Sequence, residues 1–225
     1  AEQIAQVRST YGLDQPPRVQ YWHWARPILR GDFGYSIRTG QPVLSEIGIR
    51  LGPTLLLASL TTLCMLVVGV TTGTVAAVHE QRGWDHLLRI GALIGVSIPD
   101  FWLAFLLILV FAVQLHWLPT HGMRGVASWL LPTICLGLAN AARLSRLTRT
   151  ALLEVRQQDY MRTVQAKGLP IPLQWWRHAL PNAAIPLLTL VATQFSHMVA
   201  GSVIIETLFA WPGIGQFYMQ AVSFR

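Results

Sequence analysis

The chain has 225 residues, of which 52% are hydrophobic and 12% are charged, and its formal net charge is +7. Soluble domains carry about twice that share of charged residues, so the composition argues against a soluble protein and for one that crosses a membrane several times. The basic residues lie in loops between apolar segments, so the positive charge does not indicate a nucleic-acid partner. Cys64 and Cys135 both lie in apolar segments, which argues against a disulfide scaffold.

Residues 1–51 are polar and rich in aromatic side chains, including Tyr21, Trp22 and Trp24. Aromatic residues at this density before an apolar segment suit a position at a membrane interface, and a small local core is the alternative. We therefore expect two regions, an external or interfacial segment over residues 1–51 and a transmembrane region over residues 52–225.

Four apolar stretches are candidate membrane spans. The first, Gly52–Val78, has no charged residue in 27 positions, more than the ~20 needed to cross a bilayer, and Gly69 and Gly73 favour close helix packing. The others are Ile90–Val113, Trp129–Ala142, which can continue as a helix through Val155, and Ala183–Ile205. Residues 206–225 are amphipathic, and Trp211–Gly215 (WPGIG) predicts a turn. The expected fold is all-α and polytopic.

The distribution of Lys and Arg predicts which loops face the cytoplasm. If the four stretches alternate, connector 79–89 and loop 143–181 share one side, with nine basic residues in 50 positions against eight in 86 on the other. The denser side is expected to be cytoplasmic. The six basic residues within 1–51 are the main observation against this orientation.

Loop 143–181 opens with Arg143, Arg146 and Arg149, which recur every three residues and therefore lie roughly on one helix face. Such a face can meet lipid headgroups, a partner protein or only solvent.

A short helix is predicted over Asp159–Leu169. Asp159 suits its N-terminus or first turn, Gly168 can end it, and Pro170 prevents its continuation. A helix of this length is not stable alone, so another part of the protein must pack on it.

The segment DYMRTVQAKGL (Asp159–Leu169), followed by RHALPNAAIP (Arg177–Pro186), resembles the cytoplasmic coupling loop of ATP-binding cassette (ABC) importer permeases. The resemblance is strongest to the peptide/nickel group, of the dipeptide and oligopeptide permease B type. Gly168 and the pair Leu180-Pro181 keep the family's spacing of glycine and Leu-Pro. Arg162-Thr163-Val164 replaces the general Glu-Ala-Ala, where the peptide/nickel group commonly has Arg-Thr-Ala. His178 replaces the usual aliphatic residue.

Further stretches resemble the same family, so the similarity runs over nearly all of the chain. They are YGLDQP (Tyr11–Pro16) and GDFGYS (Gly31–Ser36) in the external segment, GVSIPDFWL (Gly95–Leu103) in the third membrane helix, and ETLFAWPGIG (Glu206–Gly215) before the last helix. Such permeases are similar to six-helix proteins of the type I importer fold, so the chain is expected to lack the first and last helices.

The resemblance implies a membrane subunit that forms half of a translocation pathway for di- or oligopeptides, in the bacterial cytoplasmic (inner) membrane. It implies as partners a second homologous permease, two ATPase subunits, a periplasmic or lipid-anchored solute-binding protein and the lipid bilayer. ATP and Mg²⁺ would bind the ATPase subunits, and no cofactor is expected on this chain, which has no GxxxxGK[ST] phosphate loop and is not expected to be an enzyme.

In that family a short cytoplasmic helix docks on an ATPase subunit and transmits its ATP-driven closure. The resemblance assigns this contact to Asp159, Tyr160, Arg162, Thr163, Ala166, Lys167, Gly168 and Leu169, and the return of the loop to Leu180 and Pro181.

Asp100 and His197 are ionisable residues within apolar stretches. An aspartate at the centre of a membrane helix costs about 2.5–3.5 kcal/mol on insertion scales, so both side chains should face a cavity or a partner. For Asp100 we expect either a place in the translocation pathway, favouring a cationic substrate group, or an intersubunit hydrogen bond, or access to water at a bend caused by Pro99.

Other functions stay open at this point. A nickel or metal-chelate importer of the same family would share these motifs, although the spacing of His79, His86, His116 and His121 predicts no metal site. An ATP-independent channel would not need a stiff cytoplasmic helix, and a secondary transporter would show ion-driven uptake without ATP. A membrane enzyme has no support, because neither HExxH nor GxSxG occurs.

Overall fold

The computed structural model describes residues 14–36 and 38–223. Within these ranges the regular elements are helical, and Tyr35 and Pro42 form one isolated antiparallel bridge. By their contacts the described residues divide into two compact units, one ending at Ile49 and the other running over Arg50–Ser223.

The first unit contains α2 (Pro17–Leu29), and α2 has no buried residue. Tyr21 and Trp24 stack at a tilt with their ring centroids 5.9 Å apart, yet both side chains are exposed. The alternative of a small local core is therefore wrong for this helix, and its aromatic residues stay available for an interface. The beginning of the YGLDQP motif, residues 11–13, lies outside the described residues.

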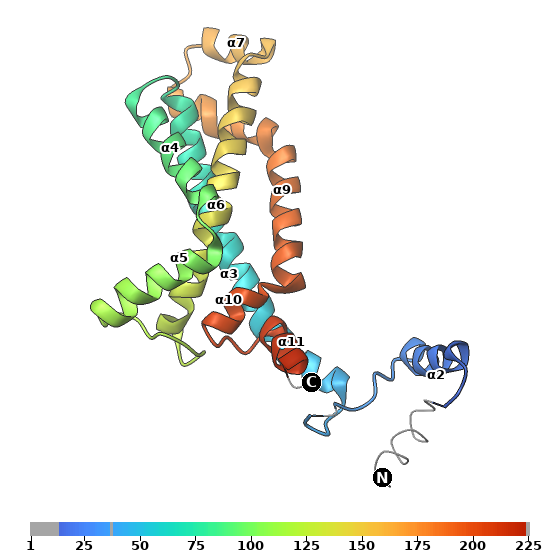
Figure 1. The fold of residues 1–225 in the computed structure, drawn as a ribbon. Coiled ribbons are helices and arrows are strands. Elements are labelled where there is room, and N and C mark those ends of the chain that lie inside the picture. Colours follow the sequence, from blue (N-terminus) through green and yellow to red (C-terminus); the bar gives the residue numbers. More distant parts are fainter. Residues whose placement is uncertain (1–13, 37, 224–225) are drawn as a thin grey trace. The chain divides into compact units, whose positions relative to one another are not determined.

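Figure 1 shows the helices of the second unit, which form a bundle around α6. In chain order they are α3 (Val43–Val78), α4 (Gly83–Ser97), α5 (Asp100–Leu107), the π-helical η1 (Ile108–Gln114), α6 (Val126–Arg156), α7 (Asp159–Ala166), α8 (Ile171–Leu173), the π-helical η2 (Gln174–Ala179), α9 (Leu180–Gly201), α10 (Val203–Leu208) and α11 (Ile214–Ser223).

Two of the four predicted spans are confirmed as continuous helices. α3 covers Gly52–Val78 and begins upstream at Val43, because residues that suit a helix continue before the apolar run. α6 covers Trp129–Ala142 and continues to Arg156, as its sequence predicts. By length and apolarity, α3 and the helical segment Ile171–Ala200 can each cross a bilayer.

The predicted span Ile90–Val113 is wrong as one continuous helix, because α4 and the α5–η1 segment meet at an angle of 102°. Pro99 has no N–H to donate and holds Ile98 in extended backbone (φ −81°, ψ 123°), so α4 ends at Ser97. The helix then restarts at Asp100.

The predicted span Ala183–Ile205 also needs a correction at both ends. The helix begins before Ala183 and ends at Gly201. Ser202 (φ −75°, ψ 56°) leaves helical geometry and separates α9 from α10. The apolar sequence continues through Ile205, so hydropathy alone does not reveal that the helix is interrupted at Ser202.

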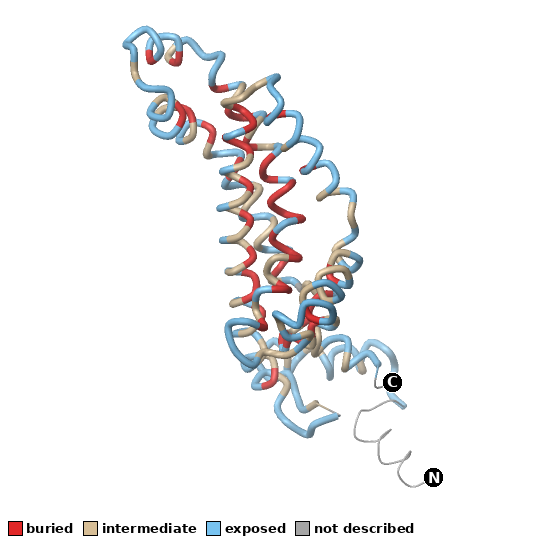
Figure 2. The backbone as a smooth tube through the Cα atoms, turned by 90° about the vertical axis from the view of Figure 1, so that its left-hand side faces the viewer, coloured by how far each residue is buried: buried red, intermediate tan, exposed pale blue. Residues whose placement is uncertain are grey.

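The helices α3 and α6 approach each other closely along a seam that contains three glycines. A Cβ at Gly69 would lie 2.8 Å from Leu144 Cβ, one at Gly73 would lie 2.6 Å from the Ser145 carbonyl oxygen, and one at Gly137 would lie 2.6 Å from Cys64 Sγ. Glycine is therefore required on both helices for this approach. Buried residues follow α6 from Ser128 to Val155 (Figure 2).

Candidate functional site

The short helix predicted within loop 143–181 is present as α7. Gln158 precedes it in extended backbone, and Asp159 lies in its first turn. α7 ends at Ala166 rather than Leu169, because Gly168 adopts a left-handed conformation (φ +67°) that turns the chain. Open space surrounds the Cα of Gly168, so the reason for a glycine here is the backbone angle.

α7 has one buried and one exposed face. Met161 and Val164 are 2% and 9% exposed and belong to an apolar cluster with Leu152, Val155 and Trp175. Six of the eight assigned residues are exposed: Asp159, Arg162, Thr163, Ala166, Lys167 and Gly168. The two buried anchors were missed from the sequence, although their spacing at i and i+3 signals a packed helix face.

The other two assigned residues, Tyr160 and Leu169, are partly buried and hold α7 to the returning chain. The Tyr160 hydroxyl donates to the His178 carbonyl oxygen at 3.2 Å, and Asn182 Nδ2 donates to the same oxygen at 2.7 Å. Burial raises the pKa of Tyr160, so its hydroxyl keeps the proton it donates. Gln174 Nε2 donates to the Leu169 carbonyl oxygen at 2.7 Å.

The loop return leads directly into a membrane helix. Leu180 is the first residue of α9 and packs against the apolar cluster beneath α7. Pro181 is exposed in the first turn of α9, directly after the π-helical η2. α7 and the start of α9 therefore pack on the same apolar cluster.

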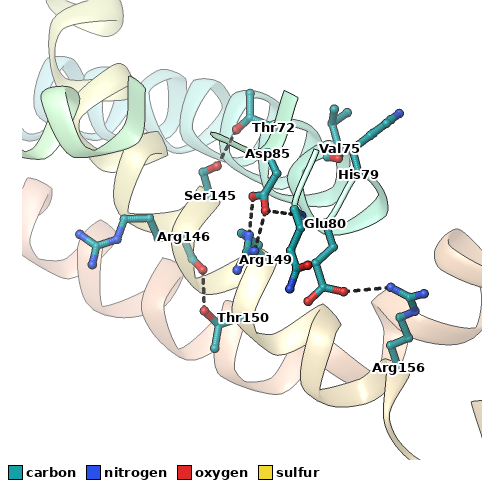
Figure 3. A network of polar contacts seen from close by, with 11 residues as sticks. Thr72, Val75, His79, Glu80, Asp85, Ser145, Arg146, Arg149, Thr150 and Arg156 are labelled. Atoms are coloured by element: carbon teal, nitrogen blue, oxygen red, sulfur yellow. Dashed lines mark hydrogen bonds and ion pairs between the residues drawn. The ribbon is translucent and has the colours of Figure 1, made fainter. Parts of the chain in front are cut away.

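Near α7, an ion pair joins the first turn of α4 to α6 (Figure 3). Arg149 Nε and Nη2 each donate to the carboxylate of Asp85 at 2.7 Å, and the Asp85 side chain is fully buried. The Gln81 N–H donates to the same carboxylate at 2.9 Å, with Gln81 itself at φ +61°. Arg156 bonds Glu80 at 3.2 Å, closer to α7.

The three arginines expected on one helix face therefore have different surroundings. Arg149 is held by Asp85, Arg143 donates to Asn140 Oδ1 at 2.9 Å, and the Arg146 side chain is exposed. The role of Asp85 was not predicted, because it lies 64 positions before Arg149.

Asp100 and His197 lie on different helices. Asp100 is the first residue of α5 and is partly buried; its carbonyl oxygen lies 3.3 Å from Cys135 Sγ. The helix is bent at Pro99, as one alternative for Asp100 assumed, and access of the Asp100 side chain to water at this bend stays a prediction. His197 is exposed on α9. A place for either residue in a translocation pathway stays a prediction.

A second polar site lies at the turn between α10 and α11. The sequence predicts a turn here but does not show the buried polar contacts. Glu206 is fully buried and accepts hydrogen bonds from Thr54 Oγ1 and from the Gln216 N–H, both at 3.1 Å. Thr54 in turn accepts from the Ile214 N–H at 2.9 Å. A Cβ at Gly213 would collide with the Glu206 carboxylate. The turn expected at Trp211–Gly215 is confirmed for residues 211–213, whereas Ile214 and Gly215 already belong to α11.

Comparison with known proteins places these features in a family. Residues 69–225 match the family model described as the binding-protein-dependent transport system inner membrane component. A probable peptide ABC transporter permease protein of Sinorhizobium fredii is 40% identical over 232 aligned positions, which cover all of this chain and 74% of the relative. Glutathione transport system permease proteins of Salmonella typhimurium and Escherichia coli are 40% identical over 225 positions, again with 74% of each relative covered.

Proposed function

The chain belongs to the family of binding-protein-dependent transport system inner membrane components, and from this membership we propose that it carries short peptides as the permease subunit of an ABC importer. The names of the relatives, a peptide permease and glutathione permeases, support peptides of a few residues as the substrate class. The apolar helices and the family support a location in the inner membrane of a bacterium, crossed several times.

The observation that carries the proposal is the two-sided construction of α7. Its outer face offers exposed polar side chains, and its inner face rests on the ends of α6 and η2 through Met161 and Val164. A partner that pushes on the outer face moves a packed unit rather than a loose loop. We assign the partner on this face to an ATPase subunit.

The complete transporter, in this proposal, contains a second homologous permease, two ATPase subunits and a solute-binding protein that delivers the peptide. ATP and Mg²⁺ bind the ATPase subunits. This chain contributes the docking helix, half of the pathway and the helices that change position when the ATPases close.

Cysteine cross-linking in the complete transporter tests the α7 contact. Thr163 is exposed on the outer face of α7. Thr150 is also exposed, but it lies on α6. Thr163→Cys should cross-link to an ATPase subunit through a short bismaleimide, with a yield that changes when ATP is added. Thr150→Cys is the matched control and should give little product. The native Cys135 is buried and Cys64 is partly buried, so their background should be low.

Uptake into proteoliposomes tests the transport activity itself. A labelled tripeptide, presented with the cognate binding protein, should accumulate only with hydrolysable ATP. Uptake driven by an ion gradient without ATP would overturn the proposed transport mechanism. The absence of cross-links from Arg162→Cys, Thr163→Cys and Lys167→Cys alike would overturn the proposed contact of α7 with an ATPase subunit.

A further inference from the structure

We propose that the groove between α4 and α6 on the side of the α3–α4 connector binds the headgroup of an anionic phospholipid. The groove has a volume of about 400 Å³ and is lined by His86, Arg89, Ile90, Leu93, Arg146 and Thr150, with Arg149 at its inner wall. The inference goes beyond peptide transport and rests only on the chain being a membrane protein.

The groove carries an excess of positive charge. Asp85 is the carboxylate beside it, and that carboxylate already accepts two hydrogen bonds from Arg149. Arg89 and Arg146 are exposed, and within the described part of the chain neither has a carboxylate within ion-pair distance. Figure 3 shows the Arg146 guanidinium pointing away from the Asp85–Arg149 pair. Two guanidinium groups are therefore left for an external anion.

The floor and the edge of the groove are apolar, which identifies the anion as part of a lipid. Ile90 and Leu93 are 57% and 58% exposed, and Ile94 continues the same exposed face of α4. Trp84, exposed one turn before Arg89, suits the level of the headgroups. A soluble phosphate would use only the arginines, whereas a phospholipid would also cover the isoleucine and leucine side chains with its acyl chains.

The depth of the groove agrees with this assignment. Arg89 immediately precedes the apolar stretch that starts at Ile90, and Arg146 follows the apolar stretch that ends at Ala142. Both guanidinium groups therefore lie where an apolar segment meets water. Anionic lipids attract basic residues at this level of a membrane.

Native mass spectrometry of the complete detergent-purified transporter tests the proposal. The probes are dioleoyl phosphatidylglycerol and dioleoyl phosphatidylcholine, which differ in charge and share their acyl chains. The native transporter should bind phosphatidylglycerol more tightly. Each of Arg89→Gln and Arg146→Gln should weaken phosphatidylglycerol binding about fivefold, and the double variant about 25-fold, as expected for arginines at an anionic surface.

Arg143→Gln is the matched control, because it removes the same charge from α6 one turn away and outside the groove. It should change phosphatidylglycerol binding by less than about twofold. Arg89→Lys with Arg146→Lys keeps both charges and should retain most of the binding. If the double Gln variant does not assemble, phosphatidylglycerol binding is compared between the two single Gln variants and the Lys variant.

Three results would overturn the proposal. Unchanged phosphatidylglycerol binding in the Gln variants would exclude the two arginines. An equal loss of phosphatidylcholine and phosphatidylglycerol would exclude recognition of charge. Complete displacement of phosphatidylglycerol by inorganic phosphate would identify the ligand as a soluble anion instead of a lipid.

Discussion

The two loops at the ends of the α6 bundle are both anchored by buried residues, but the chemistry of the anchors differs. The helix α7 rests on apolar side chains, chiefly Met161, Val164 and Trp175. The α10–α11 turn is held by the carboxylate of Glu206, which binds Thr54 and the Gln216 N–H, in addition to the buried side chains of Phe209 and Trp211. Apolar contacts are non-directional and allow small shifts, whereas a buried polar network loses much of its energy when one member leaves.

This difference predicts which substitutions each loop tolerates. A change on the outer face of α7 can alter docking while the fold persists. A change in the α10–α11 network leaves buried donors without their acceptor and weakens the turn.

The largest effect on stability is expected from Glu206→Ala. The substitution leaves Thr54 and the Gln216 N–H without their buried acceptor and opens a cavity, and it should cost about 3 kcal/mol. The measurement is the thermal unfolding of the complete transporter in detergent. Thr207→Ala, at the exposed neighbouring position, is the control and should stay near the native midpoint. Equal thermal unfolding midpoints for Glu206→Ala and Thr207→Ala would show that the Glu206 hydrogen bonds do not stabilise the α10–α11 turn.

Met161→Ala should have the next largest effect. It removes a buried side chain from the apolar base of α7 and should cost about 2 kcal/mol, at the lower end for buried methionine because a short helix can settle into the gap. Hydrogen exchange should increase in α7 and stay unchanged in α11. Increased exchange in both regions would show that the two ends are not independent.

Gly168→Val should affect function more than stability. A β-branched residue at φ +67° is strained by about 1–2 kcal/mol, and the strain displaces the turn that ends α7. ATP hydrolysis should continue while peptide uptake falls. Gly83→Val places the same residue at an open helix N-terminus and serves as the control. Normal uptake by the Gly168 variant in proteoliposomes would remove the coupling role of α7.

Asp100→Asn should have the smallest effect. If Asp100 meets a cationic substrate group, the apparent affinity for a peptide with a free amino group should fall about fivefold, while an N-acetylated peptide is unaffected. The melting temperature should stay unchanged, because the side chain is only partly buried. An unchanged affinity for both peptides would exclude Asp100 from the pathway.

The features that the sequence predicts correctly have local signals. The length of α6 follows from an apolar run continued by helix-forming residues, and α7 follows from the acid at Asp159 and the turn at Gly168. The bend at Pro99 was mentioned only as an alternative, because a proline in an apolar run is compatible with both a kinked and a broken helix.

The features that the sequence does not reveal depend on residues far apart in the chain. Asp85 and Arg149 are separated by 64 positions, and Thr54 and Glu206 by 152. The sequence shows that Asp85 is charged and that Thr54 has a hydroxyl group, but it does not show which distant residue each one contacts. The partner depends on how the helices pack. The apolar anchors of α7 are an intermediate case, because their spacing is visible but the surface they contact is not.

The glycines of the α3–α6 seam set how closely the two helices pack. A Cβ at Gly69 or Gly73 would collide with α6, and a Cβ at Gly137 would collide with Cys64 on α3. The distance between the two helices therefore depends on the absence of a side chain at these three positions, and a single added methyl group would force the helices apart at that point.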